Sequence, residues 1–83
     1  MKKQIQKVKL VYTDGVRSNK EYNVKLFEVL QGYKVECSYG KRYQASNHSS
    51  KTINPVSYDA ALNIYNNVIT QKIRKGYEIC NHI

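Results

Sequence analysis

The sequence predicts an α+β domain, in which a small antiparallel β-sheet of four to five strands carries one long α-helix on one face. Three observations predict it. Apolar residues occur at every second position in several segments of the first half, as they do in half-buried strands. One longer segment in the second half has the period of an amphipathic helix. A single helix can cover only one face of a sheet, which leaves the other face uncovered.

The chain has the size of one small domain. It contains 83 residues, of which 41% are hydrophobic. That fraction excludes a disordered chain, although the mean hydropathy is low at −0.66. We therefore expect residues 1–83 to form a single domain with a thin core.

Two strands are predicted in the first third of the chain. The segment 5–12 (IQKVKLVY) alternates between apolar and polar residues. The segment 22–30 (YNVKLFEVL) begins in the same way, but its apolar residues change phase between Leu26 and Phe27. This change predicts either a β-bulge at that point or burial on both faces.

Turn residues separate these strands from their neighbours. The connection 13–20 has its sharpest turn signal at positions 14–15, Asp-Gly. Gln-Gly at 31–32 is short enough for a tight hairpin into a third strand, 33–39. The polar segment that follows predicts a loop and then a weak strand around 46–53.

The helix is predicted over 57–75. Ser57 can cap its N-terminus, and Gly76 follows its last turn as a C-terminal stop. A short final strand then begins at Tyr77. Seven apolar residues recur at helical spacing along the helix: Tyr58, Ala61, Leu62, Tyr65, Val68, Ile69 and Ile73.

The charge of the chain indicates an anionic partner. Fourteen Lys and Arg against six Asp and Glu give a net charge of +8. Such an excess favours nucleic acid over a membrane surface or an acidic protein, and the alternative is a surface that only keeps the protein soluble. No apolar run approaches the ~20 residues of a membrane span, and the N-terminal residues lack the apolar block of a signal peptide. We expect a cytoplasmic protein without membrane contact.

Catalysis is not expected. His48 lies in a polar segment and His82 near the C-terminus, and neither has a nucleophile motif beside it. Together with Cys37 and Cys80 they show no spacing typical of a zinc site. We expect both cysteines to act as small apolar fillers, and we expect neither a metal nor another cofactor.

Basic and aromatic residues gather where the second predicted strand begins and the third ends. In a hairpin these two ends lie side by side, so we expect one shared edge of the sheet. An amide, several cations and aromatic rings can hold a phosphate and stack on an exposed base or sugar. Tyr39 is also in phase with Val35 and Cys37, so a core position is the alternative for it. The candidate residues are Asn19, Lys20, Tyr39, Lys41, Arg42 and Tyr43.

Three motifs resemble the WGR domain, a small module of DNA-break-sensing poly(ADP-ribose) polymerases and of many bacterial proteins. SNKEYNVKLFEV is similar to the family's Asn-Lys-aromatic-Tyr strand, and VECSYGK to the strand that ends in Trp-Gly-Arg. YDAALNIYNNVITQKIRKGYEI resembles the helix that closes in Lys-x-x-x-Gly-Tyr. The resemblance extends over roughly residues 10–79.

Four positions depart from the family pattern. Tyr39 replaces the tryptophan, and Lys41 replaces the arginine and so lacks its planar bidentate fork. Tyr43 replaces a second glycine, and Glu21 stands where the family has an aromatic residue. Arg42, one position on, is a candidate to take over the arginine's role, although its strand parity is opposite.

The resemblance implies a function. In the polymerases the Trp and Arg contact the DNA end and neighbouring domains, and the Asn-Lys pair lies near the DNA backbone. Carried over, this implies such contacts for Tyr39, Lys41, Asn19 and Lys20. We expect a non-catalytic, monomeric module that binds nucleic acid, DNA rather than RNA, at its backbone or its ends. The alternative is a protein-interaction or regulatory module whose basic residues bind an acidic partner.

Overall fold

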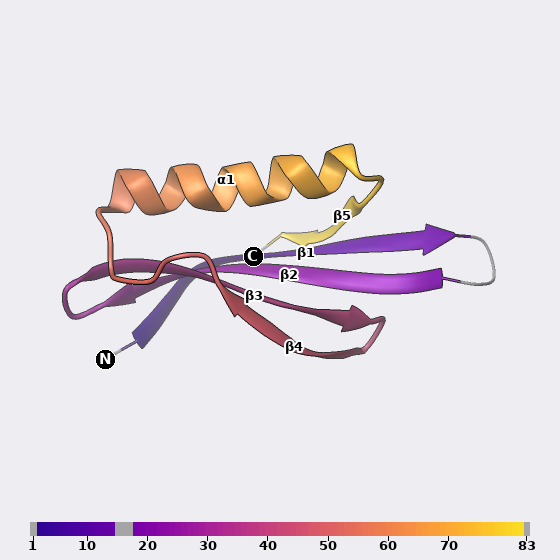
Figure 1. Ribbon diagram of the computed structural model, residues 1–83, viewed down its shortest axis with the longest axis horizontal. Helices are drawn as coiled ribbons and strands as arrows, with labels where there is room; N and C mark the ends of the chain where they lie inside the picture. The colour runs from indigo at the N-terminus through magenta and orange to yellow at the C-terminus, as the bar shows by residue number, and fades with distance from the viewer. Residues whose placement is uncertain (1, 15–17, 83) are drawn as a thin grey trace.

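The computed structural model describes residues 2–14 and 18–82. It is an α+β fold, a five-stranded antiparallel sheet in the order β4-β3-β2-β1-β5 with one helix across one face (Figure 1). This confirms the predicted fold class. The elements are β1 (Lys2–Asp14), β2 (Ser18–Val29), β3 (Gly32–Lys41), β4 (Gln44–Ser50), α1 (Tyr58–Arg74) and β5 (Glu78–His82).

The core lies between the sheet and α1. Alternate residues of β1, β2 and β3 point toward the helix, and the largest are fully buried. Burial of each such aliphatic side chain stabilises the fold by about 1.5–3 kcal/mol. The buried apolar residues are Val8, Leu10, Tyr22, Val24, Leu26, Val35 and Cys37 from the sheet, and Ala61, Tyr65 and Val68 from the helix.

Both ends of the helix follow the predicted signals. The Ser57 hydroxyl accepts a hydrogen bond from the Ala60 N–H at 3.2 Å, which satisfies one free donor of the first turn. After the last turn, Gly76 has a φ of 105°, and a Cβ there would lie 3.0 Å from the ring of Tyr12. Glycine therefore allows the chain to turn back closely against the sheet and enter β5.

The bulge occurs at the predicted level of the sheet but in the neighbouring strand. Gln4 pairs with Phe27 and Gln6 pairs with Leu26, so the extra residue is Ile5 of β1. β2 itself keeps its alternation: Phe27 faces away from the helix, where the Lys2 ammonium lies 4.4 Å from the centre of its ring. The phase change in β2 therefore reflects apolar residues on both of its faces.

The hairpin between β2 and β3 turns one residue earlier than predicted. Leu30 and Gln31 form the turn, and Gly32 pairs with Val29 as the first residue of β3. The weak strand predicted around 46–53 is β4, which begins and ends earlier. The turn predicted at 14–15 reaches outside the described residues.

The helix leaves one strip of its own side of the sheet uncovered. α1 packs mainly on β2, β3 and β5, whereas the edge strand β4 curves away from it (Figure 1). We call the opposite side of the sheet the open face, since no described element covers it. Within residues 2–14 and 18–82, no helix is long and apolar enough to cross a membrane.

Candidate nucleic-acid interface

Two stacked tyrosines lie where the helix stops covering the sheet. Tyr22 of β2 and Tyr39 of β3 are directly paired, with ring centroids 5.4 Å apart and planes 13° from parallel. Tyr22 is 5% exposed, and its ring and that of Tyr77 pack in a T-shaped arrangement. Tyr39 is 37% exposed. It therefore continues the core row of Val35 and Cys37, but part of its ring remains accessible.

The ring of Tyr39 lines a groove of about 650 Å³ on the helix side of the sheet. The groove extends between the last turn of α1 and the strands β3 and β4, which is the strip that the helix leaves uncovered. We call it the tyrosine groove. Its lining residues are Lys20, Glu21, Tyr22, Tyr39, Gly40, Lys41, Asn47, Ser49, Lys51, Lys72 and Tyr77.

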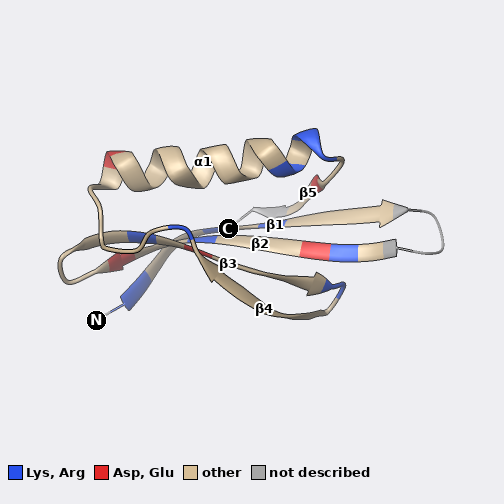
Figure 2. Ribbon diagram, in the orientation of Figure 1, with Lys and Arg blue, Asp and Glu red and all other residues tan. Residues whose placement is uncertain are grey.

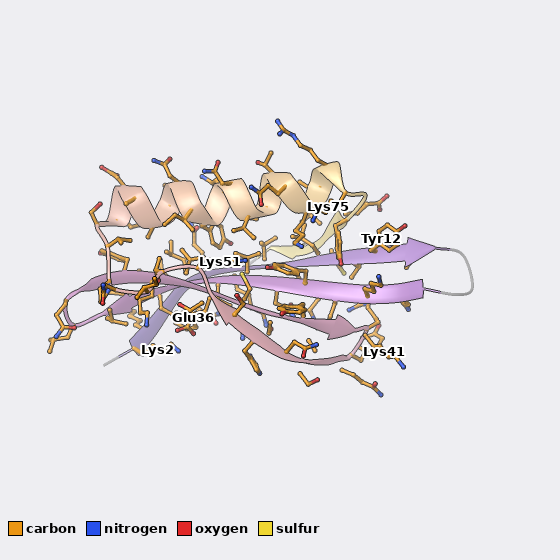
Figure 3. All side chains as sticks on the ribbon, in the orientation of Figure 1. Lys2, Tyr12, Glu36, Lys41, Lys51 and Lys75 are labelled. Carbon is orange, nitrogen blue, oxygen red and sulfur yellow. The ribbon has the colours of Figure 1, made fainter. Side chains whose placement is uncertain are left out.

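Four lysines from four parts of the chain surround the groove. Lys20 and Lys41 are paired across β2 and β3, Lys51 follows β4, and Lys72 comes from the last turn of α1. Figure 3 shows Lys41 at the end of the sheet and Lys51 near its middle. Figure 2 shows that the basic residues at the ends of β2 and β3 and those of the last helical turn lie at the same end of the molecule.

These four cations lack anionic partners within the described part of the chain. The ion pairs there involve Lys2, Lys9 and Arg42 instead. The Lys72 ammonium lies 4.3 Å from the centre of the Tyr22 ring. Partial burial lowers the pKa of Lys72, and the charges of Lys75 and Lys51 lower it further. An anion in the groove would relieve this repulsion.

The six residues predicted for the site meet along the backbone, but their side chains divide between the two faces. Lys20, Tyr39 and Lys41 line the tyrosine groove. The Arg42 N–H donates to the Asn19 carbonyl at 2.9 Å, so the strand ends lie together as expected. Asn19, however, has the opposite strand parity to Lys20.

Arg42 and Tyr43 belong to a separate cluster around Glu21. The guanidinium of Arg42 lies 3.4 Å from a Glu21 oxygen, and its centre is 4.2 Å from the centre of the exposed Tyr43 ring. Because Arg42 directly follows Lys41, its side chain has the opposite strand parity and lies on the open face. In this arrangement Arg42 contributes to the β3–β4 turn, and Lys41 is the cation at the groove.

The carboxylate of Glu21 organises this cluster. It is 5% exposed and accepts hydrogen bonds from the Tyr43 N–H at 2.8 Å and from the Asn23 amide at 2.9 Å. Burial alone raises the pKa of Glu21, but these two hydrogen bonds and the charges of Lys9 and Arg42 outweigh it. The net result is a pKa below the usual value of 4.5.

Several groove residues were missed in the sequence. Asn47, Ser49 and Lys51 belong to the weakly patterned segment around β4. Lys72 lies in the last turn of α1, where a basic residue favours the C-terminal end of a helix and so indicates no site by itself. Its spacing carried a further signal, because Lys72 lies four residues after Val68 and therefore on the packed face of α1.

The two cysteines have different environments. Cys37 is buried in the core, as predicted. The prediction for Cys80 is wrong, since its side chain is exposed on the edge strand β5, and its sulfur accepts a hydrogen bond from Arg42 Nη2 at 3.7 Å. No group of three or more His, Cys, Asp and Glu within the described ranges could hold a metal ion.

Comparison with known proteins adds no relative. No family model matches the chain, and no curated protein and no solved structure is similar to it.

Proposed function

We propose that this protein is a non-catalytic nucleic-acid-binding module that contacts the backbone or the ends of DNA through the tyrosine groove. The observation that carries the proposal is the set of four lysines without ion-pair partners among the described residues, gathered around a half-exposed aromatic ring. Phosphates supply the missing negative charge, and the ring offers a surface on which a base or sugar can stack.

The resemblance to the WGR domain supports the same proposal. The family usually has glycine at the position of Tyr43, and here that residue has a φ of 67°, in the left-handed region that favours glycine. Gly40, the central residue of the Tyr-Gly-Lys motif, has a φ of 154°, and a Cβ there would lie 3.0 Å from the Gln44 carbonyl oxygen. At both positions, therefore, the backbone has a positive φ, which glycine adopts more easily than other residues.

The open face favours nucleic acid over a protein partner. A protein-binding surface usually has an apolar centre. By strand parity the open face carries Lys7, Lys9, Lys25, Lys34 and Glu36, and its apolar residues, Val11, Phe27 and Val29, are only partly exposed, with Lys2 lying against the ring of Phe27. The tyrosine groove, by contrast, combines positive charge with accessible aromatic surface.

A salt series tests the proposal. Binding of blunt, nicked and single-stranded DNA is measured by fluorescence anisotropy at increasing salt, and log K should fall with a slope of about −0.9 per phosphate contacted on duplex. Lys41→Gln and Lys51→Gln should each weaken binding and reduce that slope by about one. Lys3→Gln is the matched control, because it removes the same charge from an exposed residue outside the groove.

Two outcomes would overturn the proposal. One is the absence of binding below ~100 μM at low salt, since even non-specific DNA binding is usually tighter. The other is an equal loss of affinity in Lys3→Gln and in the two groove variants, which would assign the binding to net charge rather than to this site.

A further inference from the structure

The shape of the tyrosine groove limits the form of nucleic acid that it can take. Proteins that read a duplex insert a helix or a β-ribbon into its major groove, which is about 12 Å wide. Here the ring of Tyr39 and the lysines around it line a hollow between α1 and β4. A single strand can enter such a hollow, whereas a base pair inside a duplex cannot.

Tyr39 offers a stacking surface that only an unpaired base can use. Its ring is held in place by the parallel ring of Tyr22, which is itself buried. Bases inside a duplex already stack on their neighbours on both sides. A base in a single strand or an overhang has a free face, and stacking on an aromatic ring is worth about 1–3 kcal/mol per base.

Polar groups and charges continue along the same groove. Asn47 of β4 is paired directly with Tyr39, and Ser49 is paired with Cys37, so an amide and a hydroxyl line the wall beside the ring. The lysines extend from Lys41 at the end of β3 to Lys51, whose N–H bonds to the carbonyl of Val35. Six residues of strand separate these levels, about 20 Å. Lys41 and Lys51 therefore attach on either side of the level of Tyr39, so that the phosphates flanking one stacked base can reach them.

We propose that the tyrosine groove binds an unpaired strand, with one base stacked on Tyr39 and the flanking phosphates held by Lys20, Lys41 and Lys51. The ligand is single-stranded nucleic acid, including the overhang of a DNA end. This inference rests on the proposed function and specifies the substrate class of the same site.

The test compares four DNA probes of related sequence at one salt concentration. They are a single strand, the blunt duplex, and the duplex with a 5′ or a 3′ overhang. We expect the single strand and at least one overhang to bind ten-fold or more tightly than the blunt duplex. The salt slope on the single strand should be near −0.7 per phosphate. A single-stranded RNA of the same sequence shows whether the sugar is distinguished.

Tyr39→Leu should weaken single-strand binding by about 5- to 150-fold, the equivalent of one base–aromatic stack, and should barely change binding to the blunt duplex. Tyr39→Phe retains the ring and should restore binding. Tyr58→Leu is the matched control, because Tyr58 is 40% exposed and also packs on another tyrosine, Tyr33, but lies outside the groove. A thermal melt of each variant verifies that it is folded.

The outcomes separate this inference from the proposed function. Equal affinity for the single strand and the blunt duplex would overturn the inference and leave the proposed function standing. The same holds if Tyr39→Leu weakens single-strand binding no more than Tyr58→Leu does. Failure of all four DNA probes to bind would overturn both.

Discussion

Replacing Glu21 by Gln should destabilise the domain, because this buried carboxylate holds the β3–β4 turn in place. Its two oxygens accept from the Tyr43 N–H and the Asn23 amide, and one also lies 3.4 Å from Arg42. Glutamine keeps one oxygen that can accept, but its NH₂ group would face an N–H donor and cannot accept a hydrogen bond from it. Hydrogen bonds to a charged group are worth about 1.5–3 kcal/mol. We expect a loss of about 2–3 kcal/mol, since both side chains of the Glu21–Arg42 pair are largely buried.

The assay is thermal unfolding followed by circular dichroism at constant ionic strength. For a domain of this size each kcal/mol shifts the melting temperature by about 4–8 °C, so Glu21→Gln should melt roughly 10–20 °C below the wild type at neutral pH. Glu28→Gln, an exposed substitution on the same strand, is the control and should change stability by less than about 0.5 kcal/mol.

The pH dependence gives a second measure of the same interaction. The pKa of Glu21 in the folded protein lies below its usual value of 4.5, so the carboxylate stabilises the fold above that pH. This contribution is lost as the pH falls through the folded-state pKa. The difference in melting temperature between the wild type and Glu21→Gln should therefore become smaller in acid. The reasoning would be refuted if Glu21→Gln had the same melting temperature as the wild type at neutral pH, or if the difference in melting temperature stayed constant down to strong acid.

Two further predictions concern the groove. Gly40→Ala should destabilise the domain by about 1–3 kcal/mol in a denaturant titration, because the φ of 154° is strained for alanine and the new Cβ meets the Gln44 oxygen at 3.0 Å; unchanged stability would show that β4 can move away. The affinity for DNA should fall as the pH rises toward 10.5, since the lowered pKa of Lys72 makes it lose its charge early. Binding titrations at neutral and alkaline pH check this, and an equally steep fall in Lys72→Gln would contradict it.

The sequence by itself determined the elements of this fold, because their signals are local. Alternation along a strand, the apolar stripe of α1, the cap at Ser57 and the stop at Gly76 each depend on residues within a few turns or pleats. The shared edge of Lys20 and Lys41 was also predictable, because in a hairpin the start of one strand lies beside the end of the next. Their direct pairing was not, since the turn predicted at 31–32 would have paired Lys20 with Tyr43.

Only the tertiary structure decided the composition of the groove. Whether Tyr39 is covered depends on where α1 ends above the sheet, and the approach of Lys51 and Lys72 depends on packing between segments far apart in the chain. The direction of Arg42 was likewise settled by a partner across the β2–β3 pair, the buried carboxylate of Glu21. Periodicity reports which side of its own element a residue occupies. It carries no information about which distant side chains share that side, because those contacts arise only when the helix packs on the sheet.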